Sequence, residues 1–387
     1  MSLFNSIRFP VWWNHVILPL TFWVYLVGFN QGLSFSAITF CLLFMVGSAC
    51  LAAYGYIVND FFDRVPDKLA GKSNFFDGSP IRTVVIAVSV ISVGATAWSF
   101  LPLTPITIGL LLLELVLLLT YSAPPLRLKN RTVGILADAL YSRVVPVLTV
   151  LSFGDVLPVS WLMVVSVWML IAGIRNILLH QISDVENDAL ANEQTAVLKI
   201  GKQRTKRLIL RFLLPLEFLL SIVSMVILSS YTSYIYLTLP FFLVLTLIRF
   251  KVWRLEYQSL ELWKERALFL PNNFYEDILP LGLLVVLSIT NPSFWPLVGA
   301  HLLIFPYSSR KTFRNLASIA SEMANYFLVS TKSTFEYLYH DVRPQLKKAI
   351  SIVVNKPIIW IFLFAGVNLE EENLSAWGYI KKSFNRL

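Results

Sequence analysis

Asn59-Asp60-Phe61-Phe62-Asp63-Arg64-Val65-Pro66-Asp67 ends a long apolar run and brings three carboxylates and one amide to its edge. At about 100° per residue, a continuing helix would gather Asn59 and the three aspartates on one face. Converging like charges repel strongly where the dielectric constant is low, and a bound divalent cation with oxygen ligands usually relieves that repulsion. These four polar residues, named the first acidic cluster, therefore predict a metal site at a membrane edge.

A second acidic pair lies far downstream. Asp184 and Asp188, named the second acidic cluster, are spaced i, i+4 and so share one helical face. The same spacing continues upstream through His180 and Asn176, which predicts a polar stripe that climbs into an apolar segment. Ionisable groups inside a membrane usually face a cavity and mark a function. Either cluster alone would also fit a helix cap or a solvated surface, and the presence of two favours metal binding.

The composition places the chain in a membrane. It has 387 residues, of which 56% are hydrophobic and 14% are charged, and its mean hydropathy is +0.67. This is far more apolar than a soluble domain requires, so we expect an integral membrane protein. Cys41 and Cys50 fall in one apolar run and are expected to be core residues. No cleavable signal peptide is expected, because the N-terminal apolar run lacks a small-residue cleavage site.

Apolar runs of spanning length predict an all-α polytopic membrane helical bundle, with about nine transmembrane helices around a central cavity. The runs cover residues 11–30, 36–57, 82–101, 105–121, 134–152, 159–182, 207–229, 233–250 and 275–291. Lys and Arg occur in the loops after the second, fourth, sixth and eighth runs, and the loops after the first, third, fifth and seventh have none. The positive-inside rule then places the N-terminus, both acidic clusters and the loop at 121–131 on the cytoplasmic face.

The C-terminal part differs from the bundle. Residues 1–306 are expected to form the transmembrane domain, and residues 307–387 a basic extension. Apolar residues recur in the extension at i, i+3 and i+4, so we expect an amphipathic helix on the membrane surface. The run at 294–305 could cross back as a tenth, tilted or re-entrant segment. Tryptophans near the ends of the apolar runs fit an interfacial belt, namely Trp12, Trp13, Trp98, Trp161 and Trp253.

Three motifs in this order resemble the UbiA superfamily of intramembrane prenyltransferases. They are NDFFDRVPD at 59–67, YSAPPLRLKNR at 121–131 and DVEND at 184–188, and the resemblance covers roughly residues 10–305. It implies a Mg²⁺-dependent transfer of a prenyl group from a polyprenyl diphosphate to an acceptor, which we expect to be aromatic. The metal-binding residues that it implies are Asn59, Asp63, Asp67, Asp184 and Asp188, with Asp60 at the edge of the first acidic cluster.

A diphosphate needs cations as well as a metal. Lys129 and Tyr121 match the loop of the resembled family, and Arg64 lies beside the first acidic cluster, so these three are expected to bind the diphosphate. Asp63 and Asp184 are the expected catalytic metal ligands. His180 is a candidate to take the proton that the acceptor loses, and could equally bond a neighbouring helix. Other nearby cations fit topology charges at least as well, namely Lys72, Arg127 and Arg131.

Two departures from the family pattern leave the acceptor open. Residues 71–74 read GKSN where many members have Asn-x-x-Arg-Pro, and residues 192–195 read NEQT where a glycine usually precedes the threonine. A terpene cyclase and a polyprenyl-phosphate phosphoribosyltransferase remain alternatives within the same fold. A transporter is the alternative from another class, although the sequence shows no clear broken helices with mid-membrane charges. Expected partners are an isoprenoid diphosphate, an aromatic or lipid acceptor and membrane lipids, with no nucleic acid.

Overall fold

A computed structural model describes residues 9–69, 71, 74, 80–154, 157–191, 193–252 and 271–313, with further positions at 316–317, 320–321 and 324. The secondary structure of these residues is helical without a strand, as predicted. The chain divides into two compact units, and the first comprises residues 1–247 and 256–312. Most of the second unit lies outside the described residues, as does most of the predicted amphipathic extension, so the boundary at 306/307 stays a prediction.

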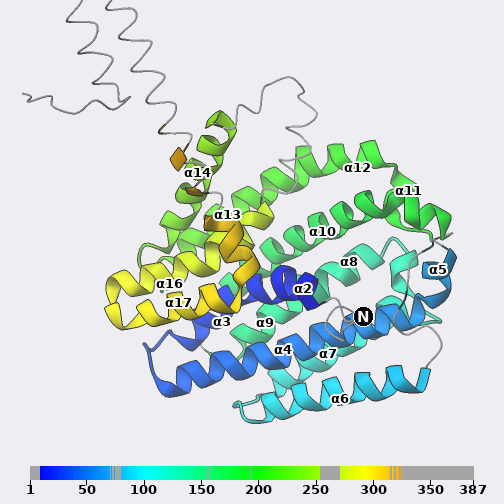
Figure 1. The fold of residues 1–387 in the computed structure, drawn as a ribbon, viewed down its shortest axis with the longest axis horizontal. Helices are drawn as coiled ribbons and strands as arrows, with labels where there is room; N and C mark the ends of the chain where they lie inside the picture. The colour runs from blue at the N-terminus through cyan, green and yellow to red at the C-terminus, as the bar shows by residue number, and fades with distance from the viewer. Residues whose placement is uncertain are drawn as a thin grey trace, which may run out of the picture. The chain divides into compact units, whose positions relative to one another are not determined.

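Figure 1 shows the helices in chain order. Those that build the walls of the first unit are α2 (Phe9–Trp12), η1 (Trp13–Ile17), α3 (Leu18–Gly28), α4 (Phe35–Phe62), α5 (Arg64–Leu69), α6 (Pro80–Ser99), α7 (Pro105–Ser122), α8 (Gly134–Ala139), η3 (Leu140–Val144), α9 (Val145–Leu151) and α10 (Val159–Leu190). The later elements are α11 (Ala196–Ile200), α12 (Lys202–Leu208), η4 (Ile209–Leu213), α13 (Leu214–Leu228), η5 (Ile235–Leu237), α14 (Thr238–Val252), η6 (Phe274–Ile278), α16 (Leu279–Thr290), η7 (Pro292–Phe294) and α17 (Trp295–Ile304).

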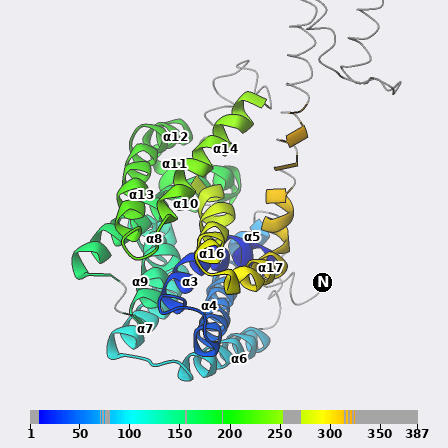
Figure 2. The ribbon, with the colours of Figure 1, turned by 90° about the vertical axis from the view of Figure 1, so that its left-hand side faces the viewer.

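Small residues let the helices approach one another closely. Helix α4 packs on α3, α6 and α7, while α10 packs on α8 and α13 (Figures 1 and 2). A Cβ atom on Gly47 of α4 would lie 2.4 Å from the ring of Trp98 on α6, and one on Gly173 of α10 would lie 2.8 Å from Ala139 of α8. Such contacts are typical of helices that associate inside membranes.

Seven helical stretches among the described residues are long and apolar enough to cross a membrane. They are Phe35–Phe62, Ile81–Ser99, Pro105–Ser122, Gly134–Leu151, Val159–Leu190, Lys202–Leu228 and Pro271–Thr290. The protein is an integral membrane protein, as its composition predicts. The other two predicted runs, 11–30 and 233–250, are also largely helical, and the total of nine spans stays a prediction.

Four π-helical turns each end two residues before a proline. These turns are η1, η3, η4 and η6, and the prolines at the second position of the following helices are Pro19, Pro146, Pro215 and Pro280. Proline has no N–H to donate, and its ring clashes with the carbonyl four residues earlier, so the helix widens there. The residue four positions before each proline, whose carbonyl the proline cannot bond, lies within the π-helical turn. It is His15 in η1 and Glu276 in η6. Carbonyl groups released in this way can accept other hydrogen bonds.

The structure corrects one expectation about the periphery. Trp12 and Trp98 are only 3% and 7% exposed, so the belt interpretation is wrong for both, because they pack into the interior of the unit. Trp253 lies outside the described residues. The run at 294–305 forms a helix, Pro292–Ile304, which is shorter than the seven spanning stretches. It ends where the Trp13 indole N–H donates to the Ile304 carbonyl at 3.0 Å.

Candidate active site

A cavity of about 640 Å³ lies inside the first unit. Both acidic clusters and the loop at 121–131 contribute to its polar end, which confirms that these three motifs meet. Its other end is mostly apolar and is lined by Leu20, Phe44, Trp98, Leu111 and Leu118, with the buried carboxyl group of Glu114 between the last two on α7. From Asp63 to Phe44 the lining follows α4 for roughly 28 Å, at 1.5 Å per residue. The cavity therefore joins a charged end to a long apolar end.

The first acidic cluster lies at a break between two helices, and not on one continuous helix as the spacing suggests. Helix α4 ends at Phe62, and the backbone N–H of Asp63 donates to the Asn59 carbonyl at 2.9 Å. The N–H of Asp67 bonds the Asp63 carbonyl at 2.8 Å, so α5 continues with similar hydrogen bonding. Asn59, Asp63 and Asp67 consequently all line the cavity. The Ser122 hydroxyl donates to Asn59 Oδ1 at 3.1 Å, which orients that amide.

The second acidic cluster lies within a helix. Helix α10 extends to Leu190, beyond the predicted end at residue 182, and so carries both aspartates. Asn176, His180, Asp184 and Asp188 all line the cavity, which confirms the predicted polar stripe. The Nε2 atom of His180 lies 3.7 Å from Asp184 Oδ2, with side-chain exposures of 69% and 32%. The stripe therefore presents accessible oxygen and nitrogen atoms to the cavity.

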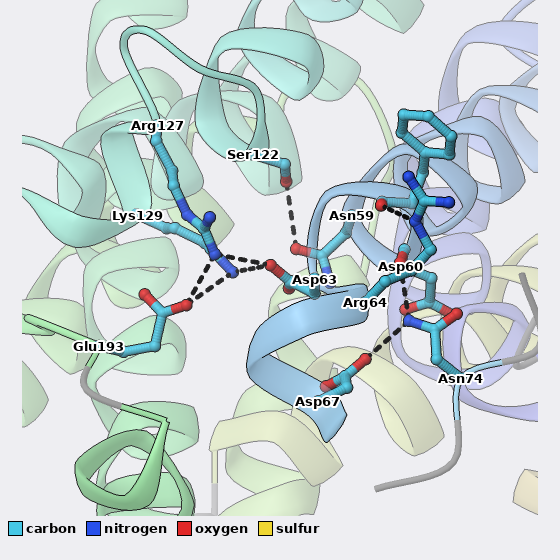
Figure 3. A network of polar contacts seen from close by, with 11 residues as sticks. Asn59, Asp60, Asp63, Arg64, Asp67, Asn74, Ser122, Arg127, Lys129 and Glu193 are labelled. Atoms are coloured by element: carbon cyan, nitrogen blue, oxygen red, sulfur yellow. Dashed lines mark hydrogen bonds and ion pairs between the residues drawn. The ribbon is translucent and has the colours of Figure 1, made fainter. Parts of the chain in front are cut away.

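Two cations from the middle loop compensate the first acidic cluster (Figure 3). Arg127 Nη2 donates to Asp63 Oδ1 at 3.1 Å and to Glu193 Oε1 at 2.8 Å. Lys129 Nζ forms an ion pair with Asp63 and lies 3.6 Å from Glu193 Oε1. Arg127 therefore belongs to this charge network and is more than a topology charge. Glu193, from the segment after the second motif, completes a group of two cations and two carboxylates.

The backbone of the middle loop is tightly constrained. Arg127 adopts a left-handed conformation with φ of 36°, which is uncommon for a residue other than glycine. A Cβ atom on Gly134, at the start of α8, would lie 2.2 Å from the Leu128 carbonyl oxygen. The loop can therefore lie this close to α8 only because residue 134 has no side chain. These two features fix the position from which Lys129 reaches Asp63.

Two predicted site residues do not line the cavity. The Arg64 side chain turns back, so that Nε donates to the Phe61 carbonyl at 2.9 Å and the guanidinium lies 4.2 Å from the centre of the Phe61 ring. Figure 3 shows it on the side of α4 away from Lys129. Asp60 is 4% exposed, and its carbonyl accepts from Asn74, which also donates to Asp67 at 2.8 Å. Lys72 lies outside the described residues.

Several residues that line the cavity were not predicted from the sequence. Tyr141 donates to Asp138, and its ring meets that of Tyr121 edge to face with centroids 5.3 Å apart. Asp138 could have been noticed as a carboxylate inside a predicted span. Glu193 had no comparable signal, because an acidic residue in a loop is ordinary. His15 and Glu276 also line the cavity, from opposite ends of the described chain.

The oxygen donors suit a metal that is shared with a substrate. Within the described ranges, no three His, Cys, Asp or Glu side chains are placed to hold one metal ion between them. Mg²⁺ usually takes one or two carboxylates from the protein and completes its octahedron with water and phosphate oxygens. The cavity-lining pairs Asp63 with Asp67 and Asp184 with Asp188 supply that number, and Asn59 adds an amide oxygen. The residues present therefore fit Mg²⁺ held together with a diphosphate.

Comparison with known proteins gives matches to one family. The sequence model of the UbiA prenyltransferase family matches residues 17–273. A comparison with curated proteins gives no match. Among solved structures, the chain is similar to a UbiA homolog from Archaeoglobus fulgidus bound to DMAPP and Mg²⁺, with 18% identity, a TM-score of 0.48, and coverage of 74% of this chain and 99% of that one. It is also similar to a digeranylgeranylglyceryl phosphate synthase, with 15% identity, a TM-score of 0.45, and coverage of 83% and 97%.

Proposed function

This chain belongs to the UbiA prenyltransferase family, and on that premise we propose that it transfers a prenyl group from a polyprenyl diphosphate to an aromatic acceptor in a Mg²⁺-dependent reaction. The observation that carries the proposal is one cavity with two acidic clusters at one end and a mostly apolar wall at the other. A prenyl diphosphate has the same division, because a charged head is joined to a hydrocarbon tail.

The polar end would bind and ionise the donor. Asn59, Asp63 and Asp67 on one side, and Asp184 and Asp188 on the other, would hold Mg²⁺, with Asp60 supporting the first acidic cluster from behind. Bound Mg²⁺ would stabilise the charge that develops on the diphosphate as the allylic carbon–oxygen bond breaks. Lys129 lines the cavity at Asp63, so it would bind the diphosphate beside the metal, and Arg127 would compensate the same carboxylate from outside the lining. A contact from Arg64 would require its side chain to leave Phe61.

The acceptor would lie next to the ionised carbon. The edge-to-face pair of Tyr121 and Tyr141 forms an aromatic wall there, which supports an aromatic acceptor and contact of Tyr121 with the donor. His180, one helical turn from Asp184, faces the same space. The loop that carries Arg127 and Lys129 belongs to the positively charged set, which supports an active site on the cytoplasmic face.

Donor cleavage by purified protein tests the proposal. Geranyl, farnesyl and longer polyprenyl diphosphates are supplied with and without Mg²⁺, together with a membrane extract as acceptor source. We expect Mg²⁺-dependent release of diphosphate and a prenylated adduct by mass spectrometry. A cyclised hydrocarbon would identify a terpene cyclase instead. If folded protein releases no diphosphate, the proposal fails, and a phosphoribosyl donor and vesicle transport become the next assays.

A further inference from the structure

His15 and Glu276 form a pair in the wall of the cavity that the polar stripe of α10 also lines. His15 Nδ1 lies 2.9 Å from Glu276 Oε1, although 261 positions separate the two residues in sequence. The imidazole is 53% exposed and the Glu276 carboxylate only 7%, and both line the cavity. A buried carboxylate thus holds an imidazole whose other edge is accessible. A pair with only a structural role would be expected to bury both groups.

The hydrogen bond determines which nitrogen is basic. An ionised carboxylate can only accept, so His15 Nδ1 must carry the proton that it donates to Glu276. In the neutral ring, Nε2 is then the unprotonated nitrogen, ready to accept a proton. A histidine oriented in this way by a carboxylate is the usual arrangement of a general base. The ring orientation therefore fits proton acceptance from a molecule in the cavity.

The two π-helical turns bring these residues to the cavity. His15 and Glu276 each precede a proline by four residues, within η1 and η6. The His15 carbonyl cannot be bonded by Pro19, and it accepts instead from Arg143 Nη2 at 3.4 Å. Arg143 is 9% exposed, lines the same cavity and belongs to a third such turn, η3. A guanidinium has five N–H donors, so Arg143 can also offer donors to an oxygen of the acceptor.

The pair lies between the two ends of the cavity. The neighbouring residues Trp12 and Ile17 share a small core with Ala53 of α4. Ala53 precedes Asp63 by ten residues, which is roughly 15 Å along a helix. This position lies on the apolar side of the acidic clusters, where the acceptor would meet the ionised end of the donor. His180 differs, because it lies beside Asp184 of the second acidic cluster.

We infer that His15, oriented by Glu276, takes the proton that the acceptor loses. This inference rests on the proposed function. In the reaction, the donor carbon–oxygen bond breaks and its electron pair leaves with the diphosphate. The acceptor forms a bond to the allylic carbon, its proton moves to His15 Nε2, and that proton passes to water as the product leaves.

The test compares four proteins: wild type, His15→Gln, Glu276→Gln and the control His301→Gln. His301 is the control, because its imidazole is also hydrogen-bonded, to Tyr25 at 3.0 Å, but it is buried and does not line the cavity. Each protein receives geranyl diphosphate, Mg²⁺ and the membrane extract, and both diphosphate and prenylated adduct are counted. In parallel, ¹⁵N-histidine NMR of the proteins in detergent reports which ring nitrogen carries the proton.

For His15→Gln we expect adduct formation to fall by about 10² to 10⁴-fold, with the KM for the donor changed by less than about threefold. For Glu276→Gln we expect a fall of at least about 10-fold and a smaller fraction of the Nδ1–H tautomer of His15, because an amide oxygen accepts more weakly than a carboxylate. His301→Gln should keep the adduct yield of the wild type. Retention of adduct formation by His15→Gln, or an equal loss in His301→Gln, would overturn the inference.

The NMR readout separates this inference from the proposed function. If wild-type protein releases no diphosphate, the proposed function fails. The spectra still show which ring nitrogen of His15 carries the proton. A neutral His15 ring with the proton on Nε2 would overturn its assignment as the base. A proton on Nδ1 that depends on Glu276 would keep the pair as a proton-accepting site for another ligand of the cavity.

Discussion

The two acidic clusters line one cavity, yet their surroundings differ. Asp63 is 11% exposed at its side chain and forms ion pairs with Arg127 and Lys129. Asp184 is 32% exposed, and its ion-pair partner in the described part of the chain is His180, at 3.7 Å. The first acidic cluster is therefore compensated by permanent cations, whereas the second is open to the cavity.

Because of this difference, altering the two clusters should affect the stability of the protein differently, even where it affects activity similarly. A buried carboxylate without a partner is costly, so the first acidic cluster depends on the cations of the middle loop. The same cations are those that a diphosphate would attract, and a metal at Asp63 would compete with them for the carboxylate. The second acidic cluster can receive a metal without breaking strong ion pairs. We therefore expect similar losses of activity and different losses of stability when each cluster is altered.

Asp63→Asn and Asp184→Asn are the strongest test of this comparison. Each removes a proposed metal ligand at nearly constant volume, so each should lower turnover by about 10³-fold. Asp63→Asn should also lower the thermal unfolding midpoint in detergent, because it leaves Lys129 and Arg127 with less compensation, whereas Asp184→Asn should not. Full activity in both variants would refute the metal assignment, and equal unfolding midpoints would refute the difference between the clusters.

Lys129→Gln is expected to have the next largest effect. The change removes one of the two cations at Asp63, and we expect kcat/KM for the donor to fall by about 10²-fold. Lys311→Gln is the matched control, since Lys311 pairs with Asp277 at 2.9 Å and does not line the cavity. Steady-state assays at saturating Mg²⁺ would measure both variants. An equal fall in the control would show that loss of any buried ion pair explains the result.

Much of the fold follows from the sequence, because its signals are local. Hydropathy locates the spans, and the i, i+4 spacing of α10 predicts correctly that His180, Asp184 and Asp188 line a cavity. The recurrence of Asn59, Asp63 and Asp67 succeeds for the same reason, even though the helix breaks at Asp63. Periodicity constrains which side of a helix a residue occupies.

The missing parts of the site depend on contacts between distant residues. Glu193 acquires its role only because Arg127 reaches it from a loop 66 positions earlier. Arg64 has the charge and position expected of a diphosphate ligand, but its side chain packs on Phe61, three residues before it. Trp98 lies near the end of an apolar run like a belt residue, and Gly47 provides the space that lets it turn inward. None of these three side-chain positions can be predicted from the spacing or composition of the sequence.

Gly134→Ala should weaken the compensation of the first acidic cluster indirectly. The new methyl group would clash with the Leu128 carbonyl and push the loop away, so Lys129 and Arg127 would reach Asp63 less well. We expect about a 10-fold loss of kcat/KM and a destabilisation of about 1–3 kcal/mol. Gly109→Ala on α7 is the control, because a Cβ atom there meets nothing within 4 Å. Unchanged donor kinetics in Gly134→Ala would show that the loop position does not set the site.

Trp98→Phe should have the smallest effect, and it tests whether the clusters act independently of the apolar end. Trp98 lines that end beside Phe44, with ring centroids 6.4 Å apart, so a smaller ring lengthens the space for the hydrocarbon tail. Turnover of geranyl diphosphate should stay within about twofold, while the ratio of kcat/KM for farnesyl over geranyl diphosphate should rise by about 2 to 10-fold. Parallel assays of Asp184→Asn in this background should show the same loss as in the wild type, because distant sites contribute additively. An unchanged ratio would mean that the tail does not reach Trp98, and a non-additive loss would mean that the two ends of the cavity are coupled.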